Sequence, residues 1–293
     1  MMMRNLLAGL ALVVLALSTG VPGADAASIT RKSIEGSMTL TGSVDIEPDG
    51  AVSSYVLDQA DKLASDLAGF MDAAITGWNF EPVRDAEGQA IPVRAPFRLR
   101  LVAEREAGDK FSVALRSVDF SEKAAENDAT RVRVAEQAPP KYPSRALKMR
   151  QPAHVLLAIQ VGRDGRVHNV STRRVNLFVP ESTGTMAKLR KEFAEISERA
   201  AWGWTYRVPT EGPEANAESW TVTVPVSYRI NGDPRGGGQH GDWTTYLPDE
   251  VRPIPWLEAD EAARMPSSDA LVDNGIYQPR EDQLHLLNPP GEG

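Results

Sequence analysis

The sequence predicts an α+β protein with two small domains, each a short antiparallel sheet with one amphipathic helix packed on a face, and an extended C-terminal tail. Three observations predict this fold: a hairpin pattern occurs twice, an amphipathic helix pattern follows each hairpin, and a proline-containing strand pattern follows each helix. The chain has 293 residues, 42% of them hydrophobic and 25% charged. This composition is typical of a globular protein and excludes disordered and collagen-like classes.

Each hairpin pattern alternates apolar and polar residues around an Asp-Gly turn. The first covers residues 43–55 with its turn at Asp49-Gly50, and the second covers residues 158–170 with its turn at Asp164-Gly165. Matched positions are 115 residues apart. Because Asp-Gly between alternating runs is a strong hairpin signal, both segments are expected to be paired strands. The shared order of landmarks indicates an internal duplication.

The two helix patterns place apolar residues three and four positions apart, which gives each helix one buried face. Thr185 is a candidate N-cap of the second helix. A further alternating strand, over residues 110–120, extends the first domain. The apolar positions are Leu57, Ala60, Ala64, Leu67, Met71, Ala74 and Trp78 in the first pattern and Met186, Leu189, Phe193, Ile196 and Ala200 in the second.

Aromatic residues gather where each helix pattern ends: Trp78 and Phe80 in the first copy, and Trp202, Trp204 and Tyr206 in the second. They could form a ligand-stacking surface. The junction of an amphipathic helix with a strand favours a core instead, where each aromatic side chain buries about 150–250 Å².

The strand after each helix contains a proline, Pro96 in the first copy and Pro225 in the second. Proline lacks the N–H that a strand ladder needs, so both prolines are expected at a sheet edge or at a bulge. An edge offers unpaired backbone groups to another chain.

The N-terminus has the order of a secretory signal peptide over residues 1–26. Arg4 precedes the apolar residues 6–17, and an A-x-A sequence at 24–26 supplies a cleavage site. The alternative is an uncleaved inner-membrane anchor, but this run is shorter than the roughly 20 apolar residues that a span needs. The sequence therefore predicts a protein that is exported to the periplasm and released from its signal peptide.

Changes of composition set the expected boundaries. A charged linker, residues 121–130, separates a first domain (29–120) from a second (131–231), and residues 232–293 form the tail. The tail is rich in proline and glycine, and from Asn231 on it carries 12 acidic and 4 basic residues. Its aromatics Trp243, Tyr246 and Trp256 indicate that part of it packs back on a domain.

Charge and residue types argue against several functions. The net charge of −8 makes a nucleic-acid partner unexpected, because such proteins neutralise phosphates with a basic face. The chain has no cysteine and its four histidines form no recognisable catalytic or metal-binding pair, so no enzyme activity, cofactor or metal is expected. The glycine run 236–238 favours a linker over a phosphate cradle, and the acidic run 258–261 favours a solvated face over a Ca²⁺ site.

Residues 140–230 of the second domain resemble the TonB C-terminal domain, a periplasmic module. The first domain is similar to a reduced version that lacks the Tyr-Pro lead-in. The resemblance rests on Tyr142-Pro143 followed by Ala146, the hairpin around Asp164-Gly165, the helix that ends in an aromatic cluster, and the strand that contains Pro225.

Members of that family bind a short extended peptide of an outer-membrane transporter by adding it to a sheet edge, and they pass on energy from an inner-membrane motor. The resemblance implies a non-enzymatic protein-binding module linked to TonB-dependent transmembrane transport, with a transporter peptide or another envelope protein as partner. Contact with the motor complex is not expected, because the chain has no clear anchor and no long Pro-rich arm. The implied peptide-binding strand is residues 220–230, with the side chains of Trp220, Val222, Val224, Val226 and Tyr228.

The alternative is an envelope structural or scaffold protein in which the repeats bind each other and the tail covers the peptide-binding edge. An exposed edge also allows self-association. The state of residues 220–230 distinguishes the two hypotheses, since a free edge favours peptide capture and a covered edge favours the scaffold.

Overall fold

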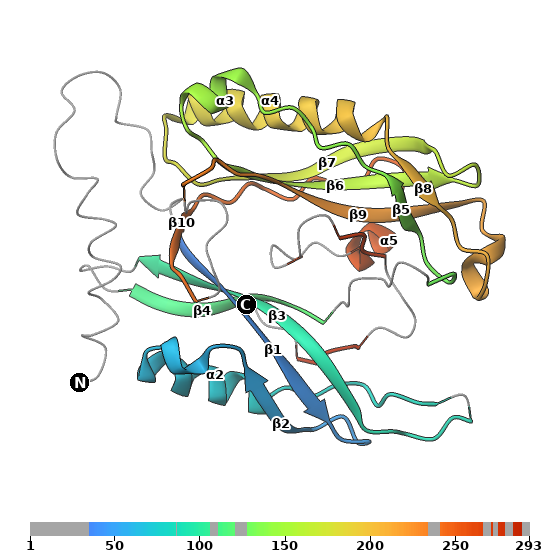
Figure 1. Ribbon diagram of the computed structural model, residues 1–293. Helices are drawn as coiled ribbons and strands as arrows, with labels where there is room; N and C mark the ends of the chain where they lie inside the picture. The colour runs from blue at the N-terminus through green and yellow to red at the C-terminus, as the bar shows by residue number, and fades with distance from the viewer. Residues whose placement is uncertain are drawn as a thin grey trace.

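The computed structural model describes residues 35–85, 87–105, 111–120, 128–233, 241–265, 271, 275–278 and 284–288. The predicted signal peptide, the glycine run 236–238 and most of the predicted linker lie outside the described residues. The protein is α+β: its two larger antiparallel sheets lie between two helices, and the tail runs between the two units so formed (Figure 1). A third sheet has two strands, which pair residues 133–136 with residues 205–207. No helix within the ranges above is long and apolar enough to cross a membrane.

The first unit is a sheet with a helix on one face. Side chains of Leu40 and Leu99 on this face pack beneath Met71 of the helix, and all three are buried. Its elements are β1(Glu35–Ile46), β2(Val52–Leu57), a 3-10 turn (Ala60–Lys62), α2(Ser65–Thr76), β3(Val93–Arg105) and β4(Phe111–Asp119).

The first helix begins later than the apolar spacing predicts. Leu57 is still paired with Gly42 in the β1–β2 ladder, so it belongs to the hairpin. Gln59 then has a left-handed backbone with φ of 52°, which interrupts the chain before α2 begins at Ser65. The helix prediction for residues 57–64 was therefore wrong, and it is confirmed for Leu67, Met71 and Ala74. The last predicted position, Trp78, lies two residues beyond the end of α2.

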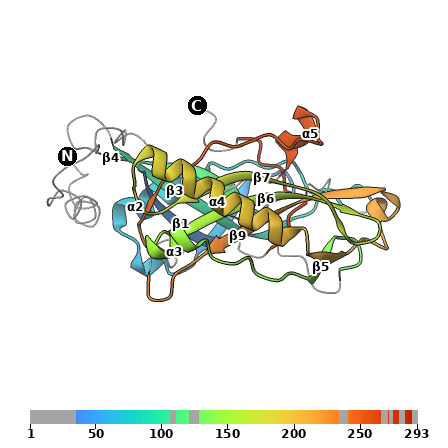
Figure 2. The ribbon, with the colours of Figure 1, turned by 90° about the horizontal axis from the view of Figure 1, so that it is seen from above.

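The second unit repeats the arrangement, with α4 lying across one face of its sheet (Figure 2). Ser182, rather than Thr185, caps α4: its Oγ accepts the Thr185 N–H at 3.3 Å, because Ser182 has the extended backbone that an N-cap needs and Thr185 is already helical. The elements are β5(Arg133–Glu136), α3(Ser144–Lys148), β6(Ala153–Gly162), β7(Val167–Leu177), α4(Thr183–Ala201), β8(Thr205–Arg207), a 3-10 turn (Pro213–Asn216) and β9(Ser219–Tyr228).

The two units share one topology. In each, the first hairpin strand pairs with its hairpin partner on one side and with the strand after the helix on the other, which gives β2-β1-β3 and β7-β6-β9. The turn glycines also match. Gly50 and Gly165 both have positive φ, and their carbonyls accept N–H bonds of 2.8 Å from Phe80 and Tyr206 respectively. These shared contacts support the duplication inferred from the sequence.

The aromatic residues at the helix ends mostly belong to the cores. Trp78, Phe80, Trp204 and Tyr206 are buried, which confirms the core interpretation for these side chains. For Trp202 that interpretation is wrong: its side chain is 52% exposed, because it is the C-cap residue of α4 and lies beyond the buried face of the helix.

The tail adds elements to the units instead of standing apart. β10(Thr244–Tyr246) pairs antiparallel with the start of β1, and Trp243 packs against the first core. Trp256 packs near Ile254 on the second sheet, as its aromatic character predicted. The short helix α5(Ala259–Arg264) was not expected from the sequence.

Candidate protein-binding site

The outer edge of β9 is occupied by a segment of the tail. The Thr223 N–H donates to the Tyr277 carbonyl at 2.8 Å, and the Tyr277 N–H donates back to the Thr223 carbonyl at 3.0 Å. The two residues thus form one antiparallel bridge. The expected peptide-binding edge is therefore covered at this point.

Pro225 confirms that this side of β9 is a sheet edge. Along a strand, the backbone groups of alternate residues point to the same side. Because Thr223 points its groups away from β6 toward Tyr277, Pro225 also faces outward. Its missing N–H therefore removes no bond to β6. Pro96 has the same relation to its sheet, since it pairs with β1 in a part of β3 that precedes the pairing with β4.

The side chains expected to line the binding strand have a different role. Those of β9 that lie on the α4 side are part of the hydrophobic core and are at most 5% exposed. The expectation that they provide pockets for a partner is therefore wrong, because they face the helix. A partner at this edge would meet the backbone of β9 and the opposite set of side chains. The buried set is Trp220, Val222, Val224, Val226 and Tyr228.

Side-chain contacts hold the tail segment on β9. The Tyr277 ring is 3% exposed and packs in a cluster with Leu156 of β6 and with Leu271. Gln278 Oε1 accepts the Val132 N–H at 3.0 Å. The bridge to Thr223 is thus fixed by packing on one side and by a hydrogen bond on the other.

The tail also covers the face of the second sheet that lies opposite α4. Ile254 and Met265 are buried against Ala158 of β6, and Trp256 Nε1 donates to Thr221 Oγ1 at 3.1 Å. The sheet is therefore buried on both faces: α4 covers one face, and tail residues cover the other. For this reason β6 is almost continuously buried, without the alternation of a sheet that has one solvated face.

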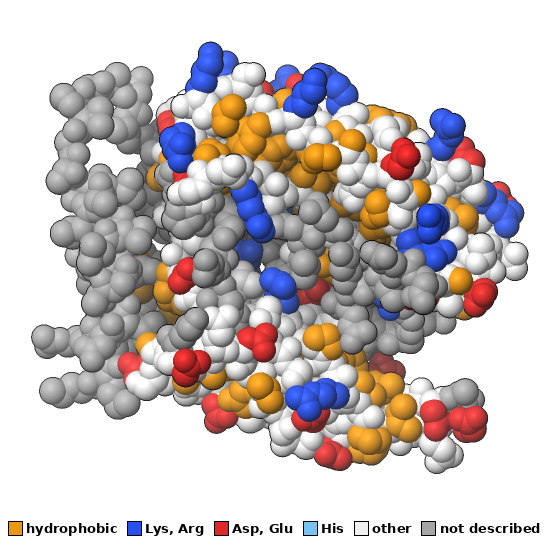
Figure 3. All heavy atoms as spheres, in the orientation of Figure 1, with side chains coloured by type: hydrophobic (Ala, Val, Ile, Leu, Met, Phe, Trp, Pro, Cys, Tyr) orange, Lys and Arg blue, Asp and Glu red, His pale blue; other side chains and the backbone are white. Residues whose placement is uncertain are grey.

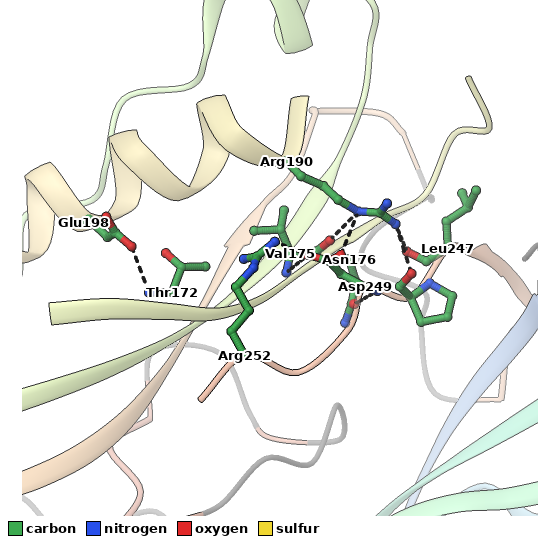
Figure 4. Close-up of polar contacts among 9 residues, drawn as sticks. Thr172, Val175, Asn176, Arg190, Glu198, Leu247, Asp249 and Arg252 are labelled. Atoms are coloured by element: carbon green, nitrogen blue, oxygen red, sulfur yellow. Dashed lines mark hydrogen bonds and ion pairs between the residues drawn. The ribbon is translucent and has the colours of Figure 1, made fainter. Parts of the chain in front are cut away.

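The opposite edge of this sheet, along β7, is held by the tail as well. Leu247 and Leu177 exchange backbone bonds of 2.8 and 3.1 Å. Arg190 of α4 reaches over β7, and its guanidinium donates to the carbonyls of Leu247 and Pro248 at 3.3 and 2.9 Å (Figure 4). Arg190 Nε also lies 3.6 Å from Asp249 Oδ1.

Asp249 adds further contacts between the tail and β7. We call the contacts of Arg190, Leu247 and Asp249 with β7 the clasp. Its N–H donates to Asn176 Oδ1 at 3.0 Å, and its Oδ2 accepts the Val175 N–H at 3.3 Å (Figure 4). The same Oδ2 lies 2.7 Å from the Arg252 guanidinium. The Asp249 side chain is only 13% exposed, so its charge is shielded from water. The guanidinium groups of Arg190 and Arg252 balance this charge.

This site is suited to backbone recognition. Among the described residues, no group of three His, Asp or Glu side chains could hold a metal ion. Lys and Arg side chains are spread over the upper unit on the face seen in Figure 3 instead of forming one basic patch. Its available groups are the N–H and C=O groups of an edge strand, which bind another extended segment.

The comparisons with known proteins add no assignment: no protein-family model matches the chain, and a search of curated proteins found no match. The fold and the site thus define an α+β protein with two helix-backed sheets and a strand edge that its own tail covers.

The residues of the clasp and of the bridge were missed by sequence reasoning. Tyr277 carried a signal, because it is the fourth aromatic residue of the tail, after the three whose aromatic character predicted packing on a domain. Arg190 and Asp249 carried none, since each is an ordinary charged residue on a helix or in a loop until the fold brings them together.

Proposed function

We propose that the chain is a periplasmic, non-enzymatic protein-binding module of the TonB C-terminal-domain type that captures an extended segment of an envelope protein at the β9 edge. An occupied edge by itself favours the scaffold considered below. The observation that carries capture is the form of the contact: at the bridge between Thr223 and Tyr277, the edge accepts an extended segment in antiparallel pairing through two backbone hydrogen bonds. The proposal names an outer-membrane transporter peptide as partner, which links the protein to TonB-dependent transport.

In this proposal the tail acts as a resident competitor. The partner has to displace residues 275–278 before it can pair with β9, and the tail is tethered, so its effective concentration at the edge is high. Affinity for a free peptide is then lower than the edge itself would give. Loosening the tail segment therefore raises the affinity.

A Tyr277→Pro variant tests the proposal in the full chain. Proline removes the N–H that bonds to Thr223, and the substitution removes the ring that packs on Leu156. We expect a peptide with the sequence of a transporter's TonB-binding segment to bind this variant at least about tenfold more tightly than the unchanged chain. Calorimetric titration measures the difference.

Val251→Pro is the matched control for that titration. Val251 also lies in the tail and is 43% exposed, and among the described residues its N–H has no hydrogen-bond partner. The affinity of the Val251→Pro variant for the peptide should equal that of the unchanged chain. If the peptide binds none of the three proteins, peptide capture at β9 is discarded.

A second candidate function is an envelope scaffold in which the tail is a permanent part of the structure. The extent of the coverage favours it, since tail residues cover the β9 edge, the β7 edge and the sheet face opposite α4. In that case Tyr277→Pro lowers stability without creating a binding site. The titration separates the two functions, because only capture predicts that the Tyr277→Pro variant binds the peptide more tightly.

A further inference from the structure

The last described residues of the chain pair with a different strand edge, in the first unit. The Glu81 N–H donates to the His285 carbonyl at 2.9 Å, and the Leu287 N–H donates to the Asn79 carbonyl at 2.8 Å. Between these bonds Phe80 forms an antiparallel bridge with Leu286. Residues 285–287 therefore run antiparallel to residues 79–81 and form one β-bridge with them.

The same place in the second unit is filled by β5. There β8 follows the helix, and Tyr206 is paired with Val134 of β5. Tyr206 is the counterpart of Phe80, because each donates its N–H to the carbonyl of the matching turn glycine. In the first unit, the C-terminal segment thus takes the position that β5 takes in the second unit.

Side chains give this contact a recognisable pattern. Leu284 and Leu286 pack against the first core, whereas Leu287 is 59% exposed. Asn288 binds the chain just after α2: its Nδ2 donates to the Gly77 carbonyl at 2.7 Å, and its Oδ1 accepts the Asn79 N–H at 3.0 Å. The segment therefore binds the first unit through two of its apolar side chains, two backbone hydrogen bonds and the side-chain amide of Asn288.

We propose that residues 77–81 form a second segment-binding site, specific for an extended peptide with two apolar residues two positions apart and an asparagine two positions further on. Its resident occupant is residues 284–288 of the same chain. The backbone groups of Asn79 and Glu81 give the affinity, and the Gly77 carbonyl together with the Asn79 N–H selects the asparagine. The site is separate from β9, whose occupant is Tyr277, and it does not depend on the function proposed for β9.

Deletion of residues 284–293 tests this site and leaves Tyr277 in place. A fluorescent peptide with the sequence of residues 283–290 is titrated into the shortened chain and into the full chain, and binding is followed by anisotropy. We expect saturable binding to the shortened chain and at least about tenfold weaker binding to the full chain, where the tethered segment competes. Equal binding to both chains, or none to the shortened chain, overturns the proposal.

Two altered peptides test the pattern. Asn288→Ala in the peptide removes two hydrogen bonds and should weaken binding about tenfold, whereas Leu287→Ala, at the exposed position, should change it less than about twofold. Equal affinity of the two peptides contradicts the recognition of asparagine. If circular dichroism shows that the shortened chain is unfolded, the full chain with Asn288→Ala replaces it, and that chain must then bind the unaltered peptide more tightly than the unchanged chain does.

Discussion

Phe193→Ala is expected to lower the free energy of unfolding of the second unit by about 3–5 kcal/mol. The Phe193 ring is fully buried beneath α4 and makes edge-to-face contacts with Tyr142 and Tyr228, whose centroids lie 5.9 and 4.7 Å away. Removing the ring loses its burial and leaves a cavity between helix and sheet. Tyr228 itself is held in place, because its hydroxyl lies 2.7 Å from Ser197 Oγ.

Denaturant unfolding followed by circular dichroism measures this loss. Trp202→Ala is the control, because Trp202 is a large aromatic residue at the end of the same helix but is half exposed. Its loss should be on the order of 1 kcal/mol or less. A Phe193→Ala chain as stable as the unchanged one would show that α4 packs by another face.

Gly165→Ala is expected to cost about 2–4 kcal/mol, from overpacking and from an unfavourable backbone conformation. Gly165 has φ of 73°, and a Cβ built there would lie 2.3 Å from the Tyr206 carbonyl oxygen. The turn would have to move away from β8 and stretch the 2.8 Å bond between the Tyr206 N–H and the Gly165 carbonyl. The matching contact at Gly50 predicts the same sensitivity in the first unit.

Gly184→Ala serves as the control for this glycine. It lies in α4, and a Cβ there would have no other atom within 4 Å. Alanine should therefore leave stability unchanged or raise it by up to about 1 kcal/mol. Thermal melts of the two variants should move in opposite directions or differ by several degrees, and identical melts would contradict the close approach at Gly165.

Local periodicity was sufficient to predict the repeated elements of the fold. Both hairpins follow from alternation around Asp-Gly, and α4 follows from the spacing of Met186, Leu189 and Phe193. The start of α2 could not be predicted in this way. Leu57 fits the helical spacing, but its pairing with Gly42 across the hairpin decides its conformation.

The candidate site was predicted in part. Pro225 located a sheet edge correctly, because the missing N–H is a local property of the residue. The alternating valines of β9 were predicted to form binding pockets, but they are buried. Apolar residues that alternate along a strand usually face the hydrophobic core, and this rule should have assigned them to the core. The alternative hypothesis expected the tail to cover this edge, and the bridge between Thr223 and Tyr277 shows such coverage at one point. Which tail residue makes the contact was not predictable, since it depends on contacts between residues far apart in the sequence.

Exchange of the Thr223 amide proton, measured by NMR, tests strand capture at β9 most directly. We expect slow exchange in the full chain, where the Tyr277 carbonyl accepts this N–H, and faster exchange in the Tyr277→Pro variant. A saturating transporter-type peptide should restore slow exchange in that variant, because the peptide takes the place of the tail. If exchange at Thr223 stays fast in the variant with peptide bound, the peptide binds elsewhere and strand capture at β9 is wrong.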